Sequence, residues 1–371
     1  MTSVDIRKYF TPLAALPYSL ALHLFLLFQV AFYSQWTSAE PIQIGGFFST
    51  GITDADTDNT VLNNYQIENK TNYLADTVFG LQLDTKISVN TRFSAQLVAK
   101  DKDNSFDVEA EWLFVSHRLS NNVDIRAGRL RLPIYLISET ILVGQSYDWV
   151  RPPFEVYSIS AGLNQYNGFS TLYKHNFESS LLEFEFMTGQ IKGELNILSV
   201  TASINSKELY GSQISYKSDR LTIRASTLDI RILVSLPALD IERDSSISMS
   251  NIGIHYVEDV WGLISEYSHL KGSQPNTYNS GYYISLYGYI DQWMPIITYG
   301  ANNIRTSLAT AMYRADSVTL GFRYNVSEAL SYKAQVTNGE IFDGAGLLIL
   351  PLLPGFDDKV TIYSMSLNLI F

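Results

Sequence analysis

The sequence predicts an all-β fold, a transmembrane antiparallel β-barrel of about sixteen strands. Three observations lead to this class. Segments of about ten residues alternate apolar with polar or small side chains along nearly the whole chain, which is the period of a strand and not of a helix. Long and short connections between these segments take turns. Beyond the N-terminal region, no run of about eighteen apolar residues could form a spanning helix.

The composition excludes several other classes of protein. The chain has 371 residues, of which 46% are hydrophobic and 17% charged, and it is therefore too apolar to be disordered. It has no Cys, so a disulfide scaffold, a thiolate metal site and a cysteine nucleophile are all excluded. The formal charge of −11 argues against nucleic acid as a partner.

The N-terminus has the pattern of a secretory signal peptide. Arg7 and Lys8 precede a mainly apolar stretch, Leu13–Tyr33, and small residues follow it. We therefore expect a signal peptide over residues 1–39 and a single barrel domain over residues 40–371. The alternative is an uncleaved anchor helix, which the length of the apolar stretch favours and its prolines disfavour.

The strands can be placed in order from the alternation. The alternation is clear in three consecutive segments near the N-terminus of the mature chain. The third segment has two clearly different faces. One face carries Val108, Ala110, Trp112 and Phe114, and the other carries Asp107, Glu109 and Glu111. The sixteen predicted strands are 42–53, 75–88, 90–101, 106–119, 123–133, 167–176, 181–191, 207–217, 220–231, 247–257, 260–271, 278–289, 291–300, 315–325, 328–338 and 360–371.

The connections separate a membrane barrel from two packed soluble sheets, which would also alternate. Tight turns such as Ser120-Asn121-Asn122 and Ser218-Asp219 alternate along the chain with segments rich in Asp, Asn, Gly or Pro, most of which are long. A barrel in an outer membrane has short turns at its periplasmic rim and long loops at its outer rim. The predicted strands are long enough to cross a bilayer, and aromatic residues are frequent near their ends.

The last strand ends in alternating apolar residues, Tyr363, Met365, Leu367, Leu369 and Phe371. This pattern resembles the assembly signal on the last strand of Gram-negative outer-membrane barrels. The resemblance implies recognition by the barrel-assembly machinery and a location in the outer membrane, among lipid and lipopolysaccharide. Any C-terminal strand could alternate in this way by chance.

The longest predicted connection, Ile134–Tyr166, follows the fifth strand. That strand ends Arg126-Ala127-Gly128-Arg129-Leu130-Arg131-Leu132-Pro133, and the connection contains Arg151-Pro152-Pro153-Phe154-Glu155-Val156-Tyr157. These motifs resemble a porin family of Gram-negative bacteria and, more distantly, the phosphate-selective porins. The resemblance implies a homotrimer of sixteen-stranded barrels, each with its third loop folded inward as a constriction.

Such a loop would narrow a lumen that sixteen strands otherwise leave wide. Opposed arginine and carboxylate rows across the opening would sort solutes by charge and size. The candidate constriction residues are Arg126, Arg129, Arg131, Glu139, Asp148, Arg151, Glu155 and Tyr157. Alternatively, Arg151 and Glu155 form a salt bridge that only holds the loop together.

The predicted inward face of the wall is charged elsewhere too. Its candidate residues are Arg92, Lys100, Asp107, Glu109, Glu111, Glu183, Glu185, Arg224 and Arg323. Because a dense basic ladder is missing, phosphate selectivity is not expected. Arg129 and Arg131 fall on the same face of the predicted strand as Ile125, which should face lipid. This placement conflicts with a position in the constriction. We therefore expect a bulge near Gly128 or an early departure of the strand from the wall.

The sequence offers little for catalysis or metal binding. The four histidines of the mature chain do not have the spacing that places two of them side by side on a strand or one turn apart on a helix. The Asp-rich stretch 54–59 could bind Ca²⁺, but it reads more simply as a solvated loop. We expect no catalytic residues and no cofactor.

The sequence thus predicts a porin, a water-filled channel for passive diffusion of small hydrophilic solutes or ions. The first alternative is a plugged outer-membrane barrel that acts as an enzyme or adhesin through its loops. The second is a soluble periplasmic β-sandwich, in which the outward faces would be buried against a second sheet.

Overall fold

The structure of the protein is a computed structural model. It describes residues 42–57, 67, 69–102, 105–160, 163–197, 200–236, 241–273, 276–307, 313–343 and 358–371. The predicted signal peptide lies outside the described residues. Among these residues, no helix has the length and apolar character needed to cross a bilayer.

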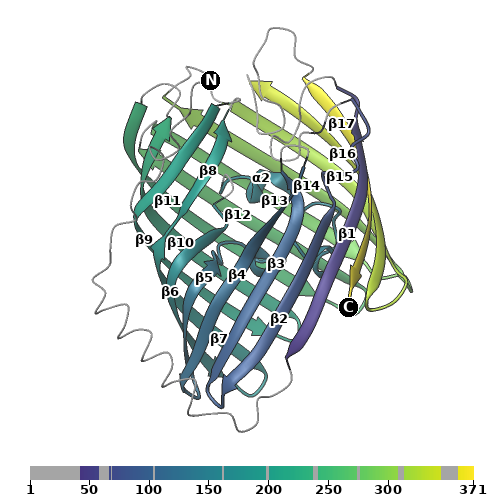
Figure 1. The fold of residues 1–371 in the computed structure, drawn as a ribbon. Helices are drawn as coiled ribbons and strands as arrows, with labels where there is room; N and C mark the ends of the chain where they lie inside the picture. Colours follow the sequence, from purple (N-terminus) through teal and green to yellow (C-terminus); the bar gives the residue numbers. More distant parts are fainter. Residues whose placement is uncertain are drawn as a thin grey trace, which may run out of the picture.

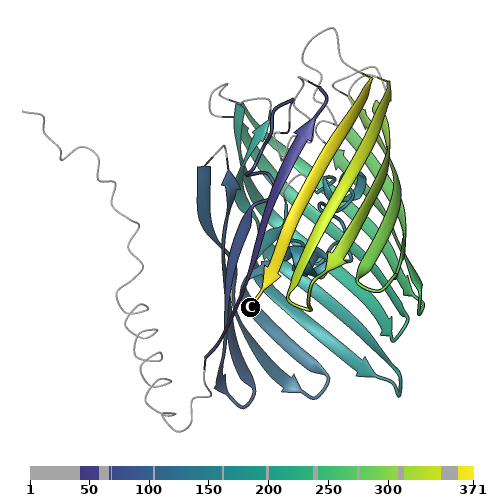
Figure 2. The ribbon, with the colours of Figure 1, turned by 90° about the vertical axis from the view of Figure 1, so that its right-hand side faces the viewer.

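One antiparallel sheet closes on itself to form the wall of a barrel (Figures 1 and 2). Its strands are β1 (Gln43–Ala55), β2 (Val78–Ser88), β3 (Thr91–Lys102), β4 (Ser105–Ser120), β5 (Val123–Arg131), β6 (Gln165–Asn176), β7 (Ser180–Gln190), β8 (Lys192–Ile197), β9 (Val200–Ser218), β10 (Leu221–Leu236), β11 (Ile241–Val257), β12 (Trp261–Ser273), β13 (Asn276–Gly288), β14 (Trp293–Thr306), β15 (Tyr313–Asn325), β16 (Leu330–Asp343) and β17 (Lys359–Ile370). Closure comes from β1, which pairs with β2 on one side and with β17 on the other.

Two of these segments form a single wall strand. β7 and β8 both pair with β9, one after the other along its length, and only Ile191 separates them. At the interruption, the Ile191 amide donates to Ser206 Oγ at 2.6 Å, and the register of β9 with β10 skips Lys207. When β7 and β8 are counted as one strand, the barrel wall has sixteen strands, which confirms the predicted fold class and strand count.

The strands of the β8–β11 region extend further than predicted. β9 begins at Val200, seven residues earlier than the alternation indicated, and β10 continues to Leu236. These extensions continue towards the rim with the long loops, where the outward face turns to polar residues such as Asn205 and Asp244. Apolar alternation marks only the part of a strand that lies in the belt of apolar residues.

The outer surface of the wall is apolar over a broad belt. Leu97, Phe169 and Leu320 are about half exposed or more, at 48%, 66% and 57%. Trp261 and Trp293 follow two of the short turns, and the ring of Trp293 lies 4.6 Å from that of Tyr324. These aromatic side chains fit the interfacial girdle of a transmembrane barrel. A single closed sheet with an exposed apolar belt contradicts the β-sandwich alternative.

The connection between β5 and β6 folds into the barrel, as predicted. It carries two 3-10 turns, η2 (Ser138–Thr140) and η3 (Gly144–Ser146), and a short helix, α2 (Phe154–Tyr157), which lies inside the ring of strands in both views (Figures 1 and 2). We call residues 132–164 the inner loop. Its Trp149 and Val156 belong to an apolar core that includes Leu228 on the inner face of β10. The inner loop therefore fills the side of the lumen next to β6–β14.

Candidate constriction site

Helix α2 rests directly on the inner surface of β13 and β14. A Cβ at Gly300 would lie 2.5 Å from Cδ of Glu155, and one at Gly281 would collide with the backbone oxygen of the same residue. Two glycines at neighbouring positions of the wall thus provide the concavity that receives the helix. Glycine within a strand was the sequence signal for this close approach.

The side chain of Glu155 is buried behind the inner loop at 1% exposure. One of its carboxylate oxygens accepts a hydrogen bond from Ser317 Oγ on β15. Burial raises the pKa of Glu155 to about 7, although the hydrogen bond from Ser317 opposes this shift. Glu155 is therefore a wall contact of α2 and does not project into open space.

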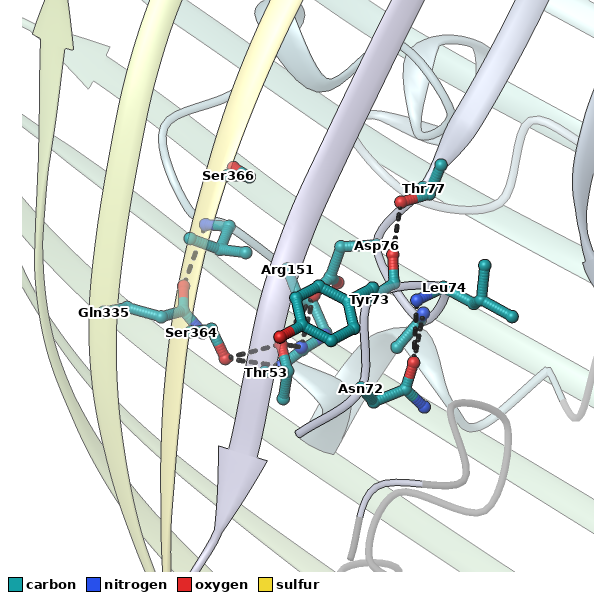
Figure 3. A network of polar contacts seen from close by, with 12 residues as sticks. Thr53, Asn72, Tyr73, Leu74, Asp76, Thr77, Arg151, Gln335, Ser364 and Ser366 are labelled. Atoms are coloured by element: carbon teal, nitrogen blue, oxygen red, sulfur yellow. Dashed lines mark hydrogen bonds and ion pairs between the residues drawn. The ribbon is translucent and has the colours of Figure 1, made fainter. Parts of the chain in front are cut away.

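Arg151 ties the inner loop to the place where the barrel closes (Figure 3). Its Nη2 lies 2.5 Å from Asp76 Oδ2 and also donates to Thr53 Oγ1, and its Nη1 donates to Ser364 Oγ at 3.0 Å. Thr53 lies on β1, Ser364 on β17 and Asp76 just before β2. The contacts of Arg151 thus run to the wall, whereas those of Glu155 run to Ser317. The structure accordingly does not bear out the idea that these two residues chiefly hold each other.

Asp76 is presented by a structured turn that precedes β2. Asn72 Oδ1 accepts hydrogen bonds from the amides of Leu74 and Ala75 (Figure 3). The Thr53 amide donates to the backbone oxygen of Asn72 at 2.9 Å. This turn therefore forms part of the inner lining near β1. The Asp-rich stretch 54–59, which was expected to be a solvated loop, begins at the end of β1. Its Asp54 accepts a hydrogen bond from Thr71, while Asp58 and Asn59 lie outside the described residues.

Two further wall residues anchor the first half of the inner loop. Glu266 on β12 accepts the Leu136 amide at 2.9 Å and the hydroxyls of Tyr157 and Tyr283. Arg224 on β10 donates to the backbone oxygen of Tyr135 at 2.7 Å and pairs with Glu139 at 2.8 Å. The inner loop is thus tied to the wall by charged groups as well as by the apolar core.

Strand β16 supplies a third set of anchors at three successive inward positions. Ser331 Oγ donates to Gln145, Lys333 Nζ donates to several backbone oxygens of the inner loop, and Gln335 Oε1 accepts the Val150 amide at 2.8 Å. No sequence pattern singled out these residues, nor Asp76 and Glu266. Their signal was weak, since polar residues alternate with apolar ones on every strand.

The expected irregularity at the end of β5 is present. Gly128 has a φ of 135°, and the pairing of β4 with β5 stops at Leu113 and Arg129. Glu111 is an extra residue in the register of β4 with β3. Residues before this bulge and after it therefore face opposite sides, so that Val108 faces outward, whereas Phe114 packs against the apolar core. The prediction that Val108, Ala110, Trp112 and Phe114 share one face of β4 was wrong because of this bulge.

The structure brings many of the selected charged residues together in pairs. In five ion pairs among the described residues, both members come from the selected sets: Lys100–Glu109 at 2.9 Å, Arg126–Glu185 at 2.7 Å, Arg131–Glu111, Arg224–Glu139 at 2.8 Å and Arg323–Asp148 at 3.2 Å. Lys100–Glu109 and Arg131–Glu111 join neighbouring strands, Arg126–Glu185 reaches from β5 across β6 to β7, and the other two pairs join the inner loop to the wall. The structure thus places opposite charges side by side and not in two facing rows.

The other selected residues occupy varied positions. Arg129 Nε donates to Gln165 at 2.8 Å, and Glu183 pairs with Lys217 at 2.5 Å. Arg92 and Asp107 are exposed on the face of the wall that continues that of Lys100. The five residues of the predicted assembly signal, Tyr363, Met365, Leu367, Leu369 and Phe371, follow the outward face of β17 to its end.

A cavity of about 320 Å³ remains between the inner loop and the opposite wall. It is lined from β1, β3 and β17 by Ser49, Lys100, Asp101, Ser366 and Asn368, and from the inner loop by Leu142, Tyr147, Val150, Arg151, Ser158 and Ser160, with Asp76 and Arg131 beside them. The inner loop thus packs through apolar contacts against β6–β14, and the cavity lies on its polar side, where Gly144 also approaches Ser49 and Asn368.

The fold of the whole barrel resembles those of solved outer-membrane proteins. It aligns with the anion-selective porin from Comamonas acidovorans at a TM-score of 0.60 and 13% identity, covering 90% of this chain and 100% of that one. The outer-membrane channel DcaP of Acinetobacter baumannii gives a TM-score of 0.59 at 12% identity, with 91% and 99% covered. The trimer form of OmpT, an outer-membrane protein of Vibrio cholerae, gives 0.58 at 11%, with 90% and 100% covered.

No protein-family model and no curated sequence matches the chain. At these identities the similarity concerns the fold alone. It confirms the expected resemblance to Gram-negative outer-membrane porins at the level of the barrel architecture.

Proposed function

We propose that the protein is a porin of the outer membrane of a Gram-negative bacterium, through which small hydrophilic solutes or ions diffuse passively. The observation that carries this proposal is the polar cavity beside the inner loop. The wall is built as a membrane-spanning barrel, and the inner loop packs against β6–β14 and reaches β1 and β17 at Gly144 and Arg151 without filling the cavity. The water path then runs between the inner loop and β1–β3 and β17.

The charges around this path favour selection by size over selection by charge. Arg151 and Arg131 line the cavity, but each is paired with a buried carboxylate, Asp76 and Glu111 respectively. A pair of opposite charges a few ångströms apart has a field that decays quickly, and salt screens the remainder. Lys100 is one-third exposed and paired with Glu109, so it is the cation best placed to meet a passing solute.

The same proposal includes the assembly and the surroundings of the barrel. We propose a homotrimer, because the fold is shared with a barrel described in a trimer form and because the outward apolar belt is broad enough for lipid and for neighbouring barrels. Lipid, lipopolysaccharide and the barrel-assembly machinery are the expected partners, the last through the outward residues of β17. No catalytic step is part of this function.

Planar-bilayer recording of the refolded mature chain tests the proposal, with the reversal potential measured in a KCl gradient. Ser158→Trp places a large side chain in the cavity and is expected to lower the single-channel conductance. Its matched control is Ser250→Trp, on the exposed outward face of β11. Equal conductance of the two variants would place the water path elsewhere. A barrel that inserts and stays silent would instead favour a plugged barrel that acts through its loops as an enzyme or adhesin.

A further inference from the structure

Lys333 is a buried lysine on the inner face of the barrel. Its side chain lies between Ser331 and Gln335 on β16, is 2% exposed and points at the inner loop. Its Nζ donates to the backbone oxygens of Gly144, Tyr147 and Trp149, and the last two lie at 2.6 and 2.9 Å. An ammonium group has three N–H donors, so all of them are used.

The three oxygens come from one short segment of the inner loop. Residues 144–149 turn so that three carbonyl groups converge on a single point, and the Tyr147 ring centroid lies 4.3 Å from the same nitrogen. Converging carbonyl dipoles repel each other unless a cation lies between them. The shape of this segment is therefore adapted to a positive charge.

The charge on Lys333 is compensated by these dipoles. Among the described residues, Lys333 forms no ion pair, and the nearby Asp148 is paired with Arg323 at 3.2 Å. A buried charge without compensating hydrogen bonds is strongly unfavourable, whereas charge-assisted hydrogen bonds are stronger than neutral ones. Displacement of the segment would leave the ammonium uncompensated, so the contact holds both partners in place.

We propose that Lys333 is a positioning residue, whose ammonium group folds residues 144–149 of the inner loop around itself and thereby sets the width of the water path. Tyr147 and Val150, within and next to this segment, line the cavity, so a shift of the segment changes the opening directly. The consequence for conductance rests on the proposed function, whereas the consequence for loop order does not.

The absence of cysteine from the chain allows a test that separates charge from shape. The single thiol of Lys333→Cys is alkylated in denaturant, before refolding, with 2-bromoethylamine. The thiolate forms a carbon–sulfur bond, bromide leaves, and the thiol proton passes to the buffer, which gives a side chain as long as lysine with an ammonium end. Alkylation with 2-bromoethanol gives a neutral side chain of the same length. Lys217→Cys, which is treated in the same way, is the control, because Lys217 pairs with Glu183 away from the inner loop.

Two measurements compare the alkylated proteins, amide hydrogen exchange of residues 141–151 and single-channel conductance. The aminoethyl protein is expected to match the wild type in both. In the hydroxyethyl protein, exchange of this segment is expected to be faster by about tenfold or more, and the conductance larger and noisier. The two products of Lys217→Cys are expected to match the wild type in loop exchange.

Equal exchange in the two products of Lys333→Cys would overturn the proposal. Failure of the hydroxyethyl product to form a folded barrel, detected by a change in gel mobility on heating, would also overturn the proposal. The ammonium group would then be needed for the wall and not for the loop. Failure of both products to fold would also count against the proposal, since restored charge would not be sufficient. If the wild-type barrel inserts but does not conduct, the porin function fails, and hydrogen exchange still decides the role of Lys333.

Discussion

Arg151 and Asp76 form an ion pair at 2.5 Å whose side chains are only 5% and 6% exposed. The pair joins the inner loop to the turn before β2, and Thr53 and Ser364 also accept hydrogen bonds from the Arg151 guanidinium group. A buried pair of this kind contributes little net stability compared with an apolar replacement, but removal of one partner leaves the other buried and uncompensated.

The first prediction follows from this asymmetry. Asp76→Asn and Arg151→Met are each expected to destabilise the barrel by about 3–5 kcal/mol. The double variant is expected to recover part of that loss, since neither charge then remains alone. Denaturant unfolding of the four proteins in a double-mutant cycle measures the coupling. Additive losses would mean that the two side chains act independently.

The second prediction concerns the pH dependence that Glu155 confers. Its pKa is raised by burial from 4.5 to about 7, so the folded protein binds a proton that the unfolded chain releases between these values. Stability is therefore expected to fall as pH rises from about 4.5 to about 7 and to level off above, by up to about 3 kcal/mol in total.

Glu155→Gln is expected to remove this fall, and unfolding midpoints between pH 4 and 8 measure the difference between the variant and the wild type. Ser317→Ala is expected to extend the fall to higher pH, because it removes the hydrogen bond that favours the carboxylate and so raises the folded pKa of Glu155 further. An unchanged profile in Glu155→Gln would assign the pH dependence to other carboxyl groups.

The third prediction concerns the glycines beneath α2. Gly281→Ala places a methyl group against the backbone oxygen of Glu155 and is expected to displace the helix and destabilise the barrel by about 1–3 kcal/mol. Gly193→Ala is the matched control, since a Cβ at Gly193 meets nothing within 4 Å. Hydrogen exchange of residues 153–160 reports the displacement. Similar exchange in the two variants would show that α2 does not depend on this contact.

The fourth prediction concerns ion preference. Lys100→Glu reverses a charge that is one-third exposed at the cavity and places it beside Glu109. The permeability ratio in a KCl gradient is expected to shift towards K⁺ by roughly two- to threefold. Lys217→Glu, on the same inner face but away from the cavity, is expected to give a smaller shift. A larger shift in the permeability ratio from Lys217→Glu would show that the narrowest point of the water path lies away from the inner loop.

Local patterns were sufficient to predict the wall of this barrel. Alternation along segments such as 79–87 and the tight turn at 120–122 depend on neighbouring residues alone. All sixteen wall strands lie where the alternation and the turns indicated. Besides the change of face at Glu111, only the strand ends beyond the apolar belt were missed. There the outward face of a strand no longer needs apolar side chains, and the pattern loses its contrast.

The site was predictable as a set of residues but not as a set of contacts. The inner loop and both members of pairs such as Arg224–Glu139 could be selected because charged residues on an inward face are conspicuous. Their partners depend on how the loop folds back across the lumen, which sequence spacing does not encode. Lys333 illustrates the limit, since its binding partners are backbone oxygens, which every residue has.

The position of Arg151 also has a consequence for the order of events during assembly. Its acceptors lie on the first strand of the barrel and on the last, and those strands are separated by more than three hundred residues of chain. The guanidinium group can therefore find its full set of acceptors only after the two ends of the sheet have met. Final locking of the inner loop becomes a late event, and an incomplete barrel keeps a loosely held interior until its last strand has been added.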